Sequence, residues 1–293
     1  MTSTTARPTT TRPATSRPAT APARSAVTVQ PVTFGRLVAA EWIKLRSLRS
    51  TWWALALAVA FFPLFAAVQT MSVARIADDA PPGAFPGPVY ATSGLMLAQL
   101  VLMGIAVVCV TGEYRSGQIR STFTAAPARL PVLGAKLTVV AATTFVTGVV
   151  GAAVGWVAAS PWFDEAGMRV DLTSAEDLRL MVGVPLYLTA MAALAFGIGT
   201  VLRSSAAGIA SALGLVFVVE PMFSYVPWAP LQQLAAYLPS AAGTRLVTSD
   251  VMGSVVSGSQ SADLSHWGGY GVLLVWVAAV LAVAAVLLRR RDA

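Results

Sequence analysis

This sequence has very little with which to perform covalent or metal chemistry. Its 293 residues include one cysteine, Cys109, and one histidine, His266. A single cysteine excludes a framework of disulfides and a multi-cysteine metal site within the chain. The lone histidine has no metal-ligand spacing around it. The chain also has no G-x-x-x-x-G-K-[ST] phosphate loop and no G-x-S-x-G nucleophile motif. We therefore expect no enzyme activity, no cofactor, no metal site and no ATP site in this chain.

Charged side chains are scarce as well. Only 11% of the residues are charged, whereas 56% are hydrophobic and the mean hydropathy is +0.70. This balance is too apolar for an ordinary soluble domain. A bilayer core about 30 Å thick requires about 20 apolar residues per helix. Stretches of this kind occur at Thr51–Val68, Gly94–Thr111, Leu137–Ala159, Leu180–Val201, Ala207–Val226 and Gly269–Leu288.

These apolar stretches lack the alternation of polar and apolar residues that is typical of membrane β-barrel strands. In lipid, a helix satisfies every backbone polar group within its own segment. We therefore predict an all-α integral membrane protein with six transmembrane helices. The link between spans 5 and 6, residues 227–268, is partly apolar and interrupted by prolines. This pattern predicts short helices at the outer face.

The basic residues are distributed unevenly among the predicted links. With the N-terminus in the cytoplasm, sixteen of the twenty lysines and arginines lie on the cytoplasmic side. This excess follows the positive-inside rule and places both termini in the cytoplasm. Because the net charge of +7 gathers at the membrane edge, we expect anionic membrane lipids, and no nucleic acid, as its partners.

Two different segments precede the first span. Residues 1–32 are rich in Thr, Pro, Ala and Arg, and we predict that they form a disordered cytoplasmic tail. Residues 33–50 predict a basic amphipathic helix at the membrane interface. The residues assigned to its interfacial role are Glu41, Trp42, Lys44 and Arg46. The residues expected on its apolar face are Phe34, Leu37, Val38, Ile43, Leu45 and Leu48.

The link between spans 2 and 3 concentrates charge in an otherwise apolar chain. Its sequence, GEYRSGQIRSTFTAAPARLPVLGAK, occupies residues 112–136. Its charged residues are Glu113, Arg115, Arg120, Arg129 and Lys136. Because the charge distribution places this link in the cytoplasm, a soluble partner can reach it.

One acid lies well inside a predicted span. At about 1.5 Å per residue, Glu220 falls in the outer half of span 5. The following Pro221 removes a backbone donor, so the helix should kink or end there. Intramembrane acids usually face a bundle interior or an aqueous cavity. Two interpretations are open: Glu220 lines a translocation path, or it is a satisfied acid at a helix break near the outer interface.

Several of these features together resemble bacterial ABC-2 type transporter permeases. The segments that carry the resemblance are EWIKLRSLRSTWW before span 1, TGEYRSGQIRSTFTAAPAR after span 2 and GAKL at the start of span 3. The resemblance covers residues 34–290 and implies a permease domain over residues 33–290 of a bacterial plasma-membrane protein. The Glu–Pro pair in span 5 and the long outer link after it are also similar to this family.

In this family a Glu, a Gly and a Thr-rich run mark a short cytoplasmic coupling helix that contacts the ATPase. Glu113, Gly117, Thr122 and Thr124 hold the matching places, whereas Gln118 stands where many relatives have Thr. The coupling residues that the resemblance implies are Glu113, Tyr114, Arg115, Gly117, Gln118 and Arg120.

The resemblance also implies a half-transporter. Two six-helix subunits, as a homodimer or a heterodimer, would form an export path together with separately encoded ATP-binding cassette subunits. The alternative is a stand-alone secondary transporter or channel without an ATPase partner. Such proteins often have several intramembrane ionisable residues or inverted repeats. This chain has one candidate acid and no evident repeat, which favours the ATP-driven permease.

Overall fold

The computed structural model of the protein describes residue 2 and residues 33–76, 84–117, 129–226, 228–250 and 264–290. The chain divides into two units, Met1–Pro31 and Val32–Ala293, and every described helix belongs to the second unit. The predicted tail, residues 1–32, lies outside the described residues except for residue 2. Residues 118–128, which include most of the predicted coupling helix, also lie outside them.

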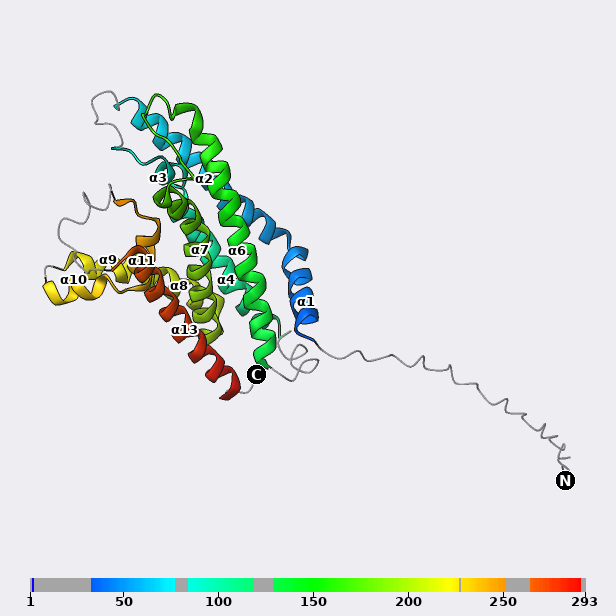
Figure 1. The fold of residues 1–293 in the computed structure, drawn as a ribbon. Coiled ribbons are helices and arrows are strands. Elements are labelled where there is room, and N and C mark those ends of the chain that lie inside the picture. Colours follow the sequence, from blue (N-terminus) through cyan, green and yellow to red (C-terminus); the bar gives the residue numbers. More distant parts are fainter. Residues whose placement is uncertain are drawn as a thin grey trace. The chain divides into compact units, whose positions relative to one another are not determined.

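Within the described residues, six helices are long and apolar enough to cross a membrane, and no strand occurs. They run side by side along the bundle, except that the last part of the fifth span turns away from it (Figure 1). Their bounds are α2, Arg49–Ala74; α4, Leu95–Ser116; α6, Arg129–Ala159; α7, Ala175–Leu202; the fifth span, Ser205–Phe223; and α13, His266–Arg290. The predicted all-α fold with six spans is confirmed.

The helix α7 lies at the centre of the bundle. In its most apolar window 72% of the residues are buried, against 22% in α2, the fifth span and α13. It packs against α4, α6, α8 and α13, and its side chains Tyr187, Met191 and Phe196 are fully buried. The outer helices instead expose large apolar side chains such as Trp53 and Val157, as expected of surfaces that face lipid.

Small residues allow α6 to pack closely against its neighbours. A Cβ at Gly155 would lie 2.2 Å from the carbonyl oxygen of Ala91, in the short helix α3 (Gly87–Ala91). A Cβ at Gly151 would meet the ring of Phe62 on α2 at 2.4 Å. Close approach at small residues is the usual way in which membrane helices gain van der Waals contact.

The fifth span contains an irregular turn. It consists of α8 (Ser205–Gly214), the π-helical turn η3 (Leu215–Val219) and α9 (Glu220–Tyr225). The predicted irregularity at Pro221 is therefore a π turn that immediately precedes Glu220, and the helix does not end at the proline. A π turn widens the helix locally, so the helix can continue past Pro221 although proline has no backbone N–H to donate.

Short elements follow the fifth span, as predicted for residues 227–268. They are α10 (Ala229–Ala235), α11 (Pro239–Thr244) and the 3₁₀ turn η4 (Arg245–Val247). Arg179 of α7 holds the last of these elements by donating to the carbonyl oxygens of Leu246 at 2.9 Å and Thr248 at 3.1 Å. These contacts fix the short elements against the end of the bundle at which α7 begins.

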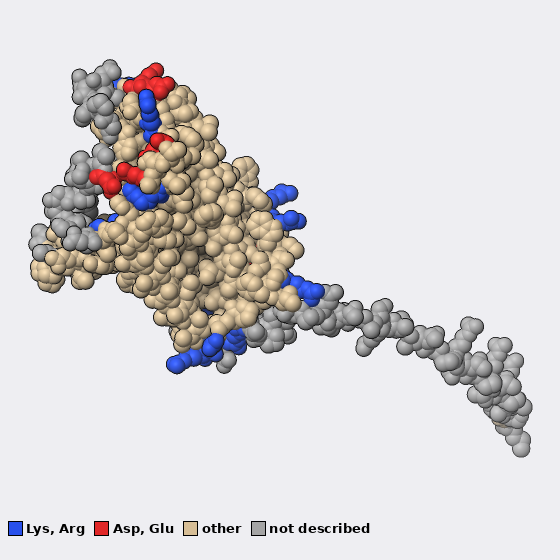
Figure 2. Space-filling model, viewed as in Figure 1, with Lys and Arg blue, Asp and Glu red and all other residues tan. Residues whose placement is uncertain are grey.

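The two ends of the bundle carry different charges. On the face shown in Figure 2, acidic side chains gather at the upper end, where α2 ends and α7 begins, and the lower end shows only lysine and arginine. We call this lower end the α1 end. It contains α1 (Phe34–Ser47), the C-terminal ends of α4 and α13, the start of α6 and the turn between α7 and α8.

Candidate functional site

The helix α1 packs against the first turns of α6, and the acid Glu41 lies at the centre of the side of α1 that faces α6. Glu41 and Leu45 are its buried residues, and Leu37 is half-buried. Residues four positions apart share a helix face, so Glu41 lies between Leu37 and Leu45. Ile43, which is 58% exposed, lies on the opposite side of the helix and is not part of the expected apolar face.

Four charged side chains meet in a closed ring beneath α1. Lys44 Nζ lies 2.7 Å from Glu41 Oε1 and 2.8 Å from Glu113 Oε1. Lys136 Nζ lies 2.5 Å from Glu41 Oε2 and 3.0 Å from Glu113 Oε1. Each ammonium group therefore donates to both carboxylates. We call these four residues the charged cluster; it joins α1 to the end of α4 and the start of α6.

The charged cluster is neutral in formal charge and largely shielded from solvent. The side chains of Glu41 and Glu113 are each 7% exposed and that of Lys136 is 9% exposed, whereas that of Lys44 is 35% exposed. A buried charge is tolerated when it is paired and hydrogen-bonded, and removing one partner leaves a costly unpaired charge. Burial lowers the pKa of Lys44, but hydrogen bonds and charge from Glu113 and Glu41 outweigh it and raise the pKa above 10.5.

A second set of contacts joins the end of α4 to the turn between α7 and α8. The Arg203 guanidinium carbon lies 5.2 Å from the centroid of the Tyr114 ring, in cation–π geometry. Arg203 has a φ of +54°, a left-handed conformation that costs a residue with a side chain about 1–2 kcal/mol. The hydroxyls of Thr111 and Ser205 lie 2.7 Å apart. The end of α4 is thus bonded to both residues that flank Ser204.

A third contact brings α13 into the same end of the bundle. Arg129 Nη1 at the start of α6 donates to the carbonyl oxygen of Leu288 at 3.1 Å. The last turn of a helix has carbonyl groups without partners in the helix, and a cation there is favourable. The α1 end therefore connects α1, α4, α6, α8 and α13 through polar contacts.

The structure brings together residues that the sequence assigned to two separate sites. Lys44, assigned to the interfacial helix, contacts Glu113, assigned to coupling, and Glu41 of the same helix is joined to Glu113 through Lys44 and Lys136. The remaining interfacial residues, Trp42 and Arg46, are exposed on α1. The backbone carbonyl of Arg46 accepts a hydrogen bond from the indole of Trp52 at 2.9 Å, which satisfies one carbonyl group at the end of α1.

The other predicted coupling residues are placed unevenly. Tyr114 lies beneath Arg203, and Gly117 ends α4 with a φ of +72°, a conformation that glycine adopts readily. The backbone of Arg115 lies in α4, but its side chain is outside the described part of the chain. Gln118 and Arg120 lie wholly outside it.

Lys136 belongs to the charged cluster, although the sequence pattern did not indicate a site at this residue. The available signal was its position among the apolar residues of the first turns of α6, close to Leu133, Leu137 and Val140. A charge in such a position requires an opposite charge nearby. Glu41 carried the same signal within α1.

Glu220 lies away from the charged cluster, in a buried polar network. It is 5% exposed, and its two oxygens accept the backbone N–H groups of Ser240 at 3.0 Å and Ala241 at 2.9 Å. The Ser240 hydroxyl lies 3.0 Å from Tyr187 Oη, which donates to Gln99 Oε1 at 2.9 Å. Glu220 thereby ties α11 to the fifth span, and a role in a translocation path remains a prediction.

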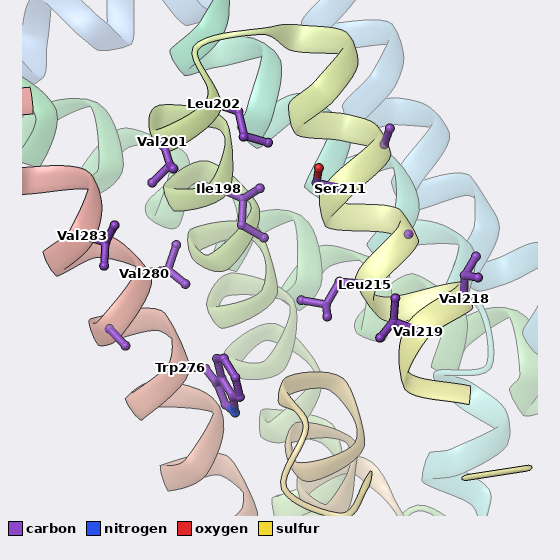
Figure 3. Close-up of a pocket in the computed structure, with 13 residues that line it drawn as sticks. Ile198, Val201, Leu202, Ser211, Leu215, Val218, Val219, Trp276, Val280 and Val283 are labelled. Atoms are coloured by element: carbon purple, nitrogen blue, oxygen red, sulfur yellow. The ribbon is translucent and has the colours of Figure 1, made fainter. Parts of the chain in front are cut away.

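An apolar pocket of about 880 Å³ opens between α7, the fifth span and α13. Side chains from all three helices line it (Figure 3). Among them are Ile198 and Leu202 of α7, Leu215 and Val219 of η3, and Trp276 and Val280 of α13. None of the lining residues is ionisable, and Glu220 is not one of them although it directly follows Val219.

Comparison with known proteins connects these features to a family. A family model described as "ABC-2 family transporter protein" matches residues 37–220. The matched region contains all four members of the charged cluster, the first four spans and most of the fifth. No curated protein matches the chain at a significant level.

Proposed function

The chain belongs to the ABC-2 family of transporter proteins, and we propose that it is the permease subunit of an ATP-driven exporter. It is a multi-pass membrane protein with six spanning helices among its described residues. A separate ATP-binding cassette subunit would supply the energy, and two permease subunits, identical or different, would form the path. The observation that carries the proposal is the charged cluster, which ties α1 to both helices that enter the α4–α6 link.

The α1 end faces the cytoplasm of a bacterial cell in this proposal, and both termini lie there. Its support is the positive charge of this end, to which the exposed arginines Arg46, Arg49 and Arg290 belong. Trp52 and Trp53 are 52% and 78% exposed beside α1. Exposed tryptophans at this height suit the headgroup region of a bilayer.

The charged cluster would pass movement from the ATPase into the bundle. The ATPase would push on the α4–α6 link, with Arg115, Gln118 and Arg120 as the contacting residues. Glu113 is 6% exposed, so its proposed role is to hold the base of the link against Lys136 and Lys44. We infer that the buried ionic contacts of the cluster fix the geometry of these helix ends, and a tied group of helix ends can move as one rigid body.

The neighbouring contacts would extend this movement to the pocket. Tyr114 with Arg203, and Thr111 with Ser205, connect α4 to the turn that begins α8. The helix α8 lines the apolar pocket together with α13. A displacement of the α4 end would therefore change the packing around the pocket. Glu220 would hold α11 at the other end of the fifth span.

The proposal is tested by purifying the chain together with a candidate ATP-binding cassette subunit from the same organism and measuring vanadate-sensitive ATPase activity in proteoliposomes. We expect the permease to stimulate the ATPase and Glu113→Gln to abolish the stimulation while the complex remains assembled. Glu165→Gln, which alters an exposed acid at the opposite end, is the matched control and should leave the stimulation unchanged. Stimulation that survives Glu113→Gln would refute the coupling role, and failure of the two proteins to associate would refute the ATP-driven permease.

A further inference from the structure

The apolar pocket is built for a hydrocarbon chain. All of its lining residues belong to membrane-spanning helices, and its volume of about 880 Å³ lies in the range of known ligand sites, about 300–1,000 Å³. The only polar side-chain groups in the lining belong to Ser211 and Trp276. The indole N–H of Trp276 already donates to the carbonyl oxygen of Tyr237 at 2.9 Å. A charged or strongly polar ligand would therefore be poorly satisfied inside the pocket.

An unusual backbone feature shapes this pocket. The π turn η3 contributes Leu215, Val218 and Val219 to the lining. A single π turn interrupts the regular hydrogen-bond pattern of an α-helix, and such turns are frequent at functional sites. Gly214, just before the turn, is also a lining residue, and a Cβ there would meet nothing within 4 Å. The wide turn and the missing side chain together leave the space open.

Among the described residues, exposed arginines lie beyond one end of the pocket lining, whereas the acid Glu220 follows the lining residue Val219 at the other end. Leu202 lines the pocket where α7 ends, at the α1 end of the bundle. On α13, Arg290 follows the lining residue Val283 by seven positions, so it lies on the same helix face about 10 Å further along the axis. Arg289 and Arg290 are both exposed. At the other end, Trp276 is joined to Tyr237.

We propose that the pocket holds an acyl chain of an anionic phospholipid from the membrane leaflet at the α1 end. The headgroup phosphate is bound by Arg290, and the chain extends along η3 toward Trp276. The complementarity of charge and apolar surface fixes this single orientation. Binding at this site can be measured on this chain alone, without an ATP-binding subunit and without knowledge of the transported substrate.

The site can be mapped with phosphatidylglycerol that carries a photoreactive diazirine on its acyl chain. The purified protein in nanodiscs is irradiated, and labelled residues are located by mass spectrometry. We expect labels on η3 and on the lining face of α13. Ala279→Phe, which fills the pocket, should abolish this labelling. Ala278→Phe is the matched control, because Ala278 is also exposed but is not a lining residue; its labelling should match that of the original protein.

The headgroup contact is tested with a phosphatidylcholine probe that carries the same acyl chain. We expect preferential labelling by phosphatidylglycerol, and the preference should fall by about fivefold when Arg290 is replaced by glutamine. Arg49→Gln, at an exposed arginine of α2, should leave the preference unchanged. Equal labelling by both probes in the original protein would overturn the anionic headgroup site.

Labelling spread evenly over the exposed faces of the bundle, or equally sensitive to Ala278→Phe and Ala279→Phe, would overturn the pocket itself. If Ala279→Phe does not fold, the same comparison is made on α8. There Ser211→Phe fills the pocket from the lining, and Ala207→Phe alters an exposed position outside it.

Discussion

A closed ring of four charges and an isolated ion pair should respond differently when an acid and a lysine exchange positions. In an isolated pair, Glu113→Lys combined with Lys136→Glu would preserve the attraction. In the ring, the new lysine at position 113 would face Lys44, and the new glutamate at position 136 would face Glu41. Two of the four attractive contacts would become repulsive, so the exchange should destabilise the protein.

The size of the loss in stability follows from how deeply each charged side chain is buried. Breaking a buried ion pair by removing one partner costs about 3–5 kcal/mol, and this applies to Lys136→Met because the side chains of Lys136, Glu41 and Glu113 are at most 9% exposed. Lys44 is 35% exposed, so solvent screens its contacts and Lys44→Met should cost about 1 kcal/mol or less. The exchange at positions 113 and 136 should be at least as harmful as Lys136→Met.

The assay is thermal unfolding in detergent, measured as the fraction of the protein that remains monomeric after heating. Reversal of all four charges, Glu41→Lys, Lys44→Glu, Glu113→Lys and Lys136→Glu, restores the alternation and should recover part of the stability lost in the exchange. Recovery of full stability by the two-position exchange alone would show that Glu113 and Lys136 form an isolated pair, and would refute the ring.

Three further predictions concern other parts of the bundle. Glu220→Gln should increase hydrogen exchange mainly at the two N–H groups of α11 that the carboxylate accepts, because a charged acceptor is lost; unchanged exchange there would contradict the contact. Although burial lowers the pKa of Lys44, its carboxylate partners raise it above 10.5. Its contribution to stability should therefore be complete below pH 10.5 and be lost as pH rises through the folded pKa. In thermal melts above pH 10.5, the melting temperature should fall more steeply with pH in the original protein than in Lys44→Met. Parallel pH curves for the two proteins would argue against this contribution of Lys44. Gly155→Ala should cost about 1–3 kcal/mol through overpacking against α3, whereas Gly104→Ala, with nothing within 4 Å of the new Cβ, should be neutral or stabilising.

The sequence predicted the spanning helices well because their signal is local. A run of about 20 apolar residues specifies a membrane helix without reference to the rest of the chain, and the ABC-2 resemblance depended on short segments in the same way. The helices are nevertheless longer than the predicted spans: α2 continues to Ala74, beyond the predicted end at Val68, and α6 begins at Arg129, before the predicted start at Leu137. Polar residues at the ends of a span can continue the helix and its backbone hydrogen bonds. Hydropathy alone therefore predicts helices that are too short.

The site was only partly predictable because it depends on which helices meet. Glu41, Lys44 and Glu113 were each identified from the sequence, but nothing in the pattern showed that α1 packs over the ends of α4 and α6. The assignment of Ile43 to the face of Phe34 was wrong for a simple reason. Nine residues make about two and a half helical turns, which places these side chains on opposite sides.

Glu220 illustrates the same limit at the other end of the bundle. Its burial in the fifth span was expected, and Pro221 correctly indicated a local irregularity. Its partners are backbone N–H groups of α11. Backbone donors leave no trace in residue identity, so only the folded chain reveals this contact.

The central claim is that α1 and the start of α6 move together when the ATPase acts. The most direct measurement is the distance between spin labels at Ile43 and Thr138, two exposed positions on α1 and α6, with Cys109 replaced by serine. The protein is reconstituted with its ATP-binding subunit, and the distance is recorded before and during ATP hydrolysis. We predict an unchanged distance in the intact cluster and a broadened distribution in Lys136→Met. A distance that shifts with ATP while the cluster is intact would contradict the account.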